Sequence, residues 1–161
     1  MTAALTLRRA TPADCRQLWL WVNDPATRAG SFSPAHVPWP DHVAWFEARL
    51  ASPDTRMFIA EADDGAPVGQ VRFALDAAGD AEMDVSLDAA WRGRHLAAGL
   101  LRMAAEAFLL EGPRRLVAHV RPENLASQRA FERAGFLRVG PEAVNGHRSV
   151  RYERRPDDQV V

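Results

Sequence analysis

The residues best suited to chemistry are two arginines and a glycine that separate an apolar, strand-like segment from a helical pattern. Arg92, Gly93 and Arg94 lie within residues 85–99, which read VSLDAAWRGRHLAAG. A helix start leaves several backbone N–H groups unpaired and carries the positive end of the helix dipole, so it stabilises an anion. Glycine allows close backbone approach, and the arginines add positive charge. The pattern predicts a phosphate site, whereas the alternative is an ordinary strand, turn and helix with two solvated arginines.

Aromatic side chains in the first half of the chain form a second group that suits ligand binding. Residues 28–40 hold four prolines and glycines among polar and aromatic residues, which predicts a structured loop. Four rings in and around this loop could wall a sugar ring or a nucleobase, while Arg28 could pair with a nucleotide phosphate. These rings belong to Trp21, Phe32, Trp39 and Trp45. The alternative is core packing for the rings and a solvated arginine. Trp19 falls on the apolar stripe of its helix, so we expect it in the core.

The overall composition excludes several function classes. The 161 residues are 47% hydrophobic, which suits one compact domain over residues 1–161. A net charge of −1 argues against nucleic-acid binding through broad phosphate neutralisation. All basic residues are arginine, so no lysine can act as a Schiff base or a general base. Because the chain has one cysteine and no apolar run of signal-peptide or membrane-spanning length, we expect a cytoplasmic protein without a metal centre.

The elements that must position these residues alternate between strands and helices, which indicates an α/β (α+β) fold. Apolar residues at strand or helix spacing, bounded by turn residues, define them. The expected strands begin near Leu5 and then cover residues 57–62, 68–75, 82–87, 116–120, 136–139 and 150–154. The expected helices cover about 12–22, 41–50, 96–112 and 124–135, with a stop at 23–25 and a closing loop at 141–146.

Two segments together closely resemble the signature segments of the GNAT acyltransferase superfamily. They are the loop RGRHLA at residues 92–97 and the helix NLASQRAFERAGF at residues 124–136. The order of strands and helices also matches this superfamily from end to end. The resemblance implies a mixed central sheet of six to seven strands, splayed between the fourth and fifth strands and flanked by about four helices. It also implies transfer of acetyl from acetyl-CoA to a primary amine by direct attack in a ternary complex.

The resemblance assigns cofactor contacts to both segments. In this superfamily the loop binds the coenzyme A pyrophosphate, and the helix flanks the pantetheine arm. The implied contacts are Arg92, Gly93, Arg94, His95, Leu96, Ala97, Asn124, Ser127 and Phe131. Leu87 would present its backbone N–H to the thioester carbonyl and stabilise the negative charge that develops there. His95 replaces the usual second glycine, although histidine tolerates a positive φ better than most residues.

Direct transfer also requires an unprotonated amine, so a nearby base with a pKa close to neutral is useful. By the resemblance, His119 is the leading candidate, because it lies on the strand across the split where many members carry a carboxylate. Glu82, and after it Asp84, are alternative bases. The competing interpretation of His119 is a buried histidine held by a backbone carbonyl.

The general acid has no clear candidate in the sequence. Many members place a tyrosine, which protonates the departing thiolate, where this chain has Phe131. The proton would then come from solvent, from Ser127 or from Tyr152, the only tyrosine. A thiol pKa near that of free cysteine, about 8.5, makes departure feasible without strong acid help.

The first half of the chain narrows the acceptor. The segments LWLWVNDPATRAGSF, HVAWF and GQVRF resemble bacterial members that acetylate nucleotide-activated amino sugars, including those of the pseudaminic acid type. The expected acceptor contacts are Trp21, Arg28, Phe32, His42 and Trp45. Members that acetylate protein N-termini, as on ribosomal proteins, or small amines are an alternative, as is a non-catalytic acyl-CoA-binding module. We expect a small-molecule partner, no nucleic acid or membrane, and a monomer or homodimer.

Overall fold

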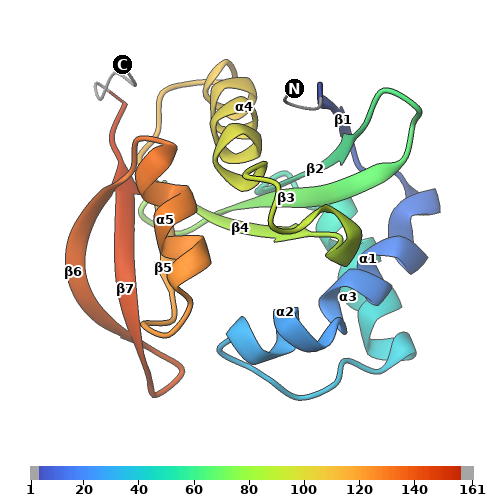
Figure 1. Cartoon of the computed structure of the whole chain (residues 1–161), viewed down its shortest axis with the longest axis horizontal. Coiled ribbons are helices and arrows are strands. Elements are labelled where there is room, and N and C mark those ends of the chain that lie inside the picture. The colour runs from blue at the N-terminus through green and yellow to red at the C-terminus, as the bar shows by residue number, and fades with distance from the viewer. Residues whose placement is uncertain (1–3, 157–161) are drawn as a thin grey trace.

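The computed structural model describes residues 4–156 and builds them around a seven-stranded mixed sheet (Figure 1). The strand order is β1-β2-β3-β4-β5-β7-β6. Neighbouring strands are antiparallel except β4 and β5, which are parallel. The strands are β1 (Thr6–Arg9), β2 (Thr55–Glu61), β3 (Pro67–Leu75), β4 (Ala81–Leu87), β5 (Leu116–Val120), β6 (Leu137–Val144) and β7 (His147–Arg154).

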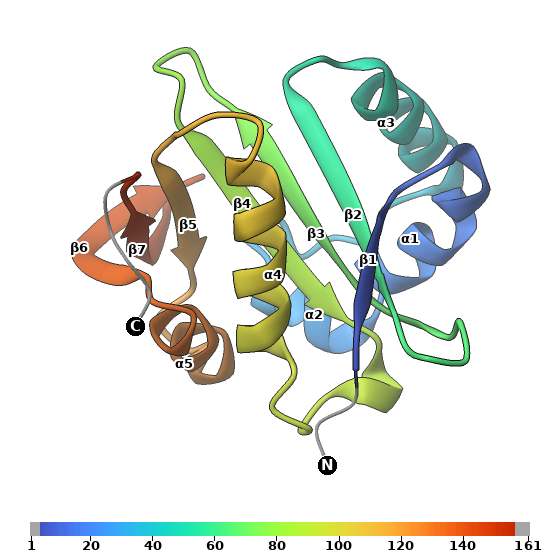
Figure 2. The same cartoon turned by 90° about the horizontal axis from the view of Figure 1, so that it is seen from above.

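Helices cover both faces of the sheet (Figures 1 and 2). On one face lie α4 (Ala97–Leu109) and α5 (Leu125–Arg133). On the other lie α1 (Cys15–Val22), α2 (Pro25–Gly30) and α3 (Trp39–Ala51). Within residues 4–156, no helix is long and apolar enough to cross a membrane.

Two hydrophobic clusters hold these layers together. The larger cluster joins α4 and α5 to the sheet and includes a stacked pair, Phe73 and Phe108, with ring centroids 4.3 Å apart. The smaller cluster joins α1, α3 and β2 through Leu18, Trp21, Phe46, Met57 and Ile59. Burying one such large apolar side chain stabilises the fold by roughly 1.5–3 kcal/mol. The two clusters therefore anchor opposite sides of the sheet independently.

The sheet is split at its centre, between β4 and β5. These strands pair only at Ala81 with Leu116 and at Glu82 with Val117. The rest of β4 therefore has an antiparallel partner, β3, on one side only. The expected mixed sheet, splayed between its fourth and fifth strands, is confirmed.

The structure corrects the expected loop after α1. The segment Asn23 to Pro25 does end α1, but Asp24 and Pro25 also begin α2. The Asp24 carboxylate accepts hydrogen bonds from the backbone N–H groups of Ala26 and Thr27, and proline is favourable at the first helical position. Residues 4–156 therefore contain five α-helices where about four were expected, and α2 occupies the start of the expected loop.

The closing strands are also longer than expected. We expected a loop at residues 141–146, but β6 continues to Val144 and β7 begins at His147. Asn145 and Gly146 form the two-residue turn, with φ values of 50° and 76°. A tight hairpin turn of this kind requires positive φ, and Asn-Gly is the pair that adopts it best. Pro141 is tolerated because β6 is an edge strand, where a missing N–H removes no hydrogen bond on the open side.

Candidate active site

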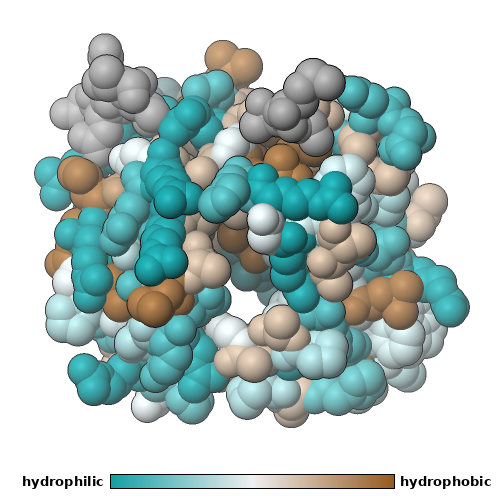
Figure 3. Space-filling view, viewed as in Figure 1, coloured by the Kyte–Doolittle hydropathy of each residue, from teal (hydrophilic) through white to brown (hydrophobic). Residues whose placement is uncertain are grey.

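A cavity of about 500 Å³ lies where β4 and β5 diverge. Its walls come from α1 to α3, from β2 to β5, and from α4 and α5, so it reaches both faces of the sheet at the split. Figure 3 shows the corresponding hollow at the centre of the molecule. This volume is typical of a small-molecule site. The expected site residues that line it are Arg28, Phe32, His42, Trp45, Asp84, Leu87, Arg92, Ala97, His119, Asn124, Ser127 and Phe131.

The loop before α4 has the geometry of an anion site. Gly93 and His95 have φ values of 75° and 58°, so the tolerance of positive φ expected of His95 is used. Leu96 occupies the N-cap position of α4, and its apolar side chain cannot cap the helix. Within residues 4–156, none of the backbone N–H groups of residues 93–99 donates a hydrogen bond. A row of free N–H groups at a helix N-terminus suits a diphosphate.

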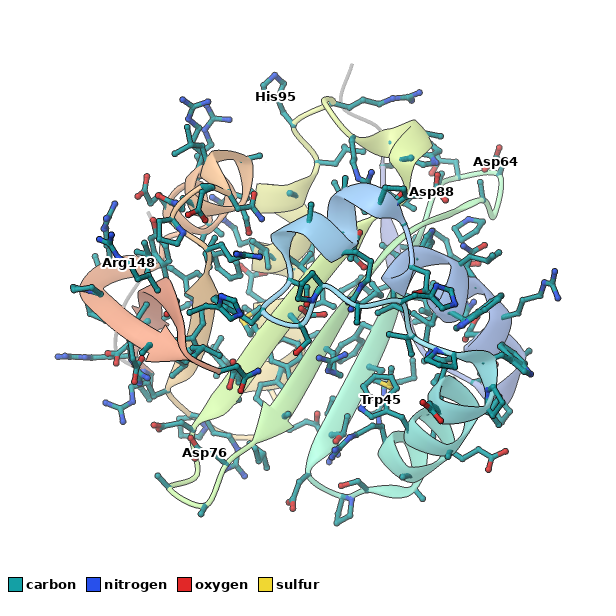
Figure 4. The ribbon with its side chains drawn as sticks, turned by 90° about the horizontal axis from the view of Figure 1, so that it is seen from below. Trp45, Asp64, Asp76, Asp88, His95 and Arg148 are labelled. Carbon is teal, nitrogen blue, oxygen red and sulfur yellow. The ribbon has the colours of Figure 1, made fainter. Side chains whose placement is uncertain are left out.

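The space over this loop is open. A Cβ atom added at Gly93 or Gly99 would meet no atom within 4 Å. Figure 4 shows the His95 side chain projecting away from the body of the protein, which leaves the helix terminus uncovered. Leu96, by contrast, is buried and fixes the loop to the larger cluster. The backbone donors and the open approach together fit the pyrophosphate of coenzyme A.

The two loop arginines have partners within the protein. Arg92 Nη2 lies 2.7 Å from Asp24 Oδ2 and 3.4 Å from Thr27 Oγ1. Arg94 stacks its guanidinium over the Trp91 ring, with Cζ 4.8 Å from the ring centroid. Arg92 therefore ties the anion loop to the first turn of α2. The alternative interpretation of the sequence, in which both arginines are simply solvated, is therefore wrong.

The start of α5 forms another part of the cavity wall. Asn124 caps α5, because its Oδ1 accepts a hydrogen bond from Ser127 N at 3.2 Å. Its Nδ2 lies 3.1 Å from the position of a Cβ at Gly30, so the end of α2 packs against the cap. Phe131 is 2% exposed and stacks on Tyr152 with ring centroids 6.0 Å apart. It provides an apolar wall without a proton donor.

Leu87 lies at the end of β4, where β3 comes close. Gly69 is its register partner. A Cβ at Gly69 would lie 2.5 Å from Ser86 O and 3.3 Å from the Leu87 Cα, so only glycine fits there. This close packing fixes the Leu87 backbone at the edge of the cavity. No local sequence pattern distinguishes Gly69 from other glycines.

His119 lies between two carboxylates. Its Nδ1 is 3.0 Å from Glu82 Oε1, and its Nε2 is 2.6 Å from Glu142 Oε2. The Glu82 hydrogen bond raises the pKa of His119; burial opposes this rise, and Glu142 adds to it. The contact with His119, helped by Arg151, lowers the pKa of Glu142. Glu82 and His119, expected as alternatives, are therefore partners, and the backbone-carbonyl interpretation of His119 is wrong.

Two polar residues of the cavity, Gln70 and Arg72 on β3, were not predicted from the sequence. Gln70 Nε2 donates to Asp84 Oδ2 at 3.0 Å and to Ser86 Oγ at 3.1 Å. Gln70 Oε1 is buried and has no hydrogen-bond partner within residues 4–156. Arg72 lies 3.8 Å from Asp84 and places its guanidinium over the Trp45 ring, 4.9 Å from the centroid. In the sequence, Gln70 and Arg72 alternate with apolar residues, which is also the pattern of an ordinary strand with one solvent-exposed face.

Two of the expected aromatic wall residues do not line the cavity. Trp21 is 4% exposed in the smaller cluster, and its Nε1 donates to Asp88 Oδ2 at 2.8 Å. It therefore holds the end of β4 and does not contact an acceptor. Trp39 is 41% exposed at the start of α3 and contacts Trp19 edge-to-face. Trp19, which was expected in the core, is only partly buried, and its Nε1 donates to Val37 O. In Figure 4, Trp45 lies between α3 and the sheet.

Arg28 and His42 line the cavity but are bound to backbone carbonyls. Arg28 Nε donates to Val22 O, and its Nη1 donates to Ser33 O and Ala35 O. Burial lowers the pKa of Arg28. His42 is 2% exposed, its Nε2 contacts Cys15 O at 2.9 Å, and burial lowers its pKa. Both side chains therefore hold the shape of the α1 to α3 wall.

The expectation that Tyr152 could supply the leaving-group proton is wrong. It is fully buried, and its hydroxyl donates to Glu132 Oε1 at 2.8 Å. Burial, together with Glu132, raises the pKa of Tyr152 to about 12. The hydroxyl does not reach the cavity.

A sheet opened between parallel central strands, with a free helix N-terminus beside the opening, is the architecture of an acyltransferase that binds coenzyme A. A model of the family described as acetyltransferase (GNAT) domain matches residues 4–137. The chain therefore belongs to the GNAT family and is an acetyl-CoA-dependent N-acetyltransferase. No curated protein sequence matches it.

Solved structures share the whole fold at low sequence identity. The chain is 23% identical to the aminoglycoside acetyltransferase AAC(6')-Ib in complex with coenzyme A and kanamycin, with a TM-score of 0.81 over 94% of this chain and 95% of that one. It is 19% identical to spermidine N-acetyltransferase from Vibrio cholerae in complex with CoA and spermine, with a TM-score of 0.82 over 96% of both chains. These likenesses concern the fold.

Proposed function

We propose that this enzyme acetylates a primary amine carried by a sugar, with a nucleotide-linked amino sugar as the acceptor favoured by the sequence resemblance. The observation that carries the proposal is the composition of the cavity wall opposite the anion loop. Asp84 supplies a carboxylate there, and Trp45 and Phe32 supply aromatic rings. A protonated amine is attracted by the carboxylate, and a sugar ring packs well on aromatic faces.

The donor side is proposed to use the open loop and the two strand ends. The N–H groups of residues 93–99 would hold the pyrophosphate, and Asn124, Ser127 and Phe131 would flank the pantetheine arm. The thioester supplies the acetyl group when the donor is bound. The Leu87 N–H would donate to the carbonyl oxygen, where negative charge develops as the amine attacks. Arg92 would contribute only as far as its ion pair with Asp24 allows.

The proton of the acceptor ammonium would be removed by His119 together with Glu82. Both groups lie on the strands that border the split, with His119 Nδ1 3.0 Å from Glu82 Oε1. Because the carboxylates raise the pKa of His119, its basic form becomes abundant only above its ordinary value of 6.5. Activity should therefore rise with pH through this range. The leaving thiolate would take a proton from solvent or from Ser127.

The experiment that tests the acceptor is a comparison of four amines with acetyl-CoA, followed by mass spectrometry of the products. The amines are a nucleotide-linked 4-amino sugar, the aminoglycoside kanamycin, spermidine and a peptide with a free N-terminus. We expect acetylation of the amino sugars, and the relative rates of the first two show whether the nucleotide matters. Acetylation of spermidine or peptide alone would overturn the sugar proposal.

A polyamine such as spermidine is a second candidate acceptor, because acidic groups lie in and beside the cavity. Asp84, Glu82 and Glu142 would suit a polycation, and the solved neighbour with spermine acts on such an amine. A peptide acceptor is less favoured, since α2 and the segment after it cover the cavity and Arg121 binds the carbonyls of Ala29 and Ser31. Coenzyme A binding without thiol release for any amine would indicate a non-catalytic acyl-CoA-binding module.

A further inference from the structure

Glu142 lies on the β6–β7 hairpin, outside every segment that the sequence associated with chemistry. Its Oε2 is 2.6 Å from His119 Nε2. Arg151 Nη1 donates to the same oxygen at 3.2 Å. Ser149, which is 1% exposed, donates through Oγ to the backbone carbonyl of Glu142 at 2.7 Å. Glu142 is therefore fixed through both its side chain and its backbone.

The carboxylate on the other side of the ring has no such support. The Glu82 side chain is 57% exposed. Within residues 4–156, its carboxylate makes a hydrogen bond only to His119 Nδ1. One ring nitrogen thus faces a carboxylate held by further hydrogen bonds, whereas the other faces a carboxylate that the described residues hold only through the ring itself.

This asymmetry determines which nitrogen can accept a proton. A neutral imidazole has one N–H and one lone pair. A fixed carboxylate at Nε2 stabilises the tautomer with the hydrogen on Nε2, which leaves the lone pair on Nδ1. Nδ1 is the nitrogen that points toward Glu82 on β4, across the split.

We propose that Glu142 is a positioning residue for His119, holding the ring in the tautomer whose Nδ1 accepts the proton of the acceptor amine. The inference rests on the proposed function, because it assigns His119 as the base. Nδ1 takes one proton from the acceptor ammonium, and the freed amine nitrogen bonds to the acetyl carbon while the thioester C–S bond breaks. The nitrogen gives its second proton to solvent, the departing thiolate takes a proton from solvent or from Ser127, and Nε2–H stays on Glu142. The charged groups that face the ring are Glu82 from β4, Glu142 from β6 and Arg151 from β7, the register partner of His119.

Two substitutions of Glu142 separate its charge from its hydrogen bond. Glu142→Leu leaves Glu82 as the only carboxylate on the ring, so the hydrogen should move to Nδ1. Imidazole ¹⁵N chemical shifts of His119 at alkaline pH should show this switch, and kcat should fall by roughly 10²–10⁴-fold with KM for acetyl-CoA unchanged. Glu142→Gln keeps an oxygen for Nε2–H and for Arg151 but removes the charge. It should retain the Nε2–H tautomer and most of kcat, with the acid limb of the pH profile moved to lower pH.

Glu106→Gln, on the exposed side of α4, is the control for loss of one negative charge, and thermal unfolding checks that each variant is folded. An unchanged tautomer in Glu142→Leu would overturn the inference, and so would a switched tautomer with full kcat. The NMR measurement needs no turnover. A wild-type protein inactive toward every amine would therefore overturn the proposed function and the catalytic part of the inference, while the tautomer shifts still report what Glu142 does to the ring.

Discussion

At the scale of single residues, His119 links folding stability to protonation. Its pKa is raised in the folded protein, chiefly by Glu82. A group with a raised folded-state pKa stabilises the fold fully below its unfolded value, here 6.5, and loses this contribution as pH rises through the folded value. The lowered pKa of Glu142 acts in the opposite direction and is lost under acid conditions. The stabilising window of the cluster therefore lies between these two transitions.

We predict that His119→Gln loses more stability near pH 6 than near pH 9, about half a unit below and well above the ordinary histidine value. Urea unfolding of both proteins at the two pH values measures the difference in the free energy of unfolding. A difference independent of pH would mean that the carboxylates do not raise the pKa of His119 in the folded protein. His36→Gln, at a histidine outside the cluster, serves as the control.

Individual residues were predictable where the backbone limits the choice of side chain. His95 was expected to tolerate a positive φ in place of the usual glycine, and its φ is 58°. Trp21 was not predictable, because its partner Asp88 lies 67 positions away in the sequence and no local pattern indicates that hydrogen bond. The same holds for Gln70 and for Glu142, whose roles depend on neighbours from other strands.

At the scale of elements, the loop and helix around α4 offer a matched pair of glycines. Gly93 has a φ of 75° and Gly99 lies in the first turn of α4, yet a Cβ at either position meets no atom within 4 Å. Only the backbone therefore distinguishes the two sites. A side chain is strained at positive φ, whereas alanine is the best residue inside a helix.

We predict that Gly93→Ala lowers the free energy of unfolding by about 1 kcal/mol and that Gly99→Ala raises it by roughly 0.5–1 kcal/mol. Guanidinium denaturation of the two variants and the wild type provides the measurement. Destabilisation of the same size in both variants would show that the loop does not keep this backbone geometry in solution.

Most elements follow from sequence periodicity, and two do not. The strands β4 and β5 lie within a residue of their expected bounds, because they are apolar or alternating runs with clear turns at both ends. The helix α2 was not predicted, because Asp24 and Pro25 signal both the end of one helix and the beginning of the next. The full length of the β6–β7 hairpin was not predicted, because Gly140 and Pro141 are residues typical of a loop. The Asn145–Gly146 pair marked the true turn.

At the scale of the whole molecule, the halves β1–β4 and β5–β7 meet in the sheet at only two paired positions. We predict that coenzyme A at 100 times its Kd raises the free energy of unfolding by about 2.7 kcal/mol and slows amide hydrogen exchange at residues 83–87 and at the start of α4. ADP, which lacks the pantetheine arm, should slow exchange at the start of α4 but not along β4. Equal protection of β4 by both ligands would contradict an arm lying in the split.

The narrow junction between β4 and β5 also has a mechanical meaning. Strand pairing is dense within each half of the sheet and sparse between them, so the packing of α4 and α5 on the sheet, more than the backbone ladder, joins the two halves. A ligand seated in the split would brace both halves from the other side, and the rigidity of the working enzyme would then be partly supplied by its own substrates.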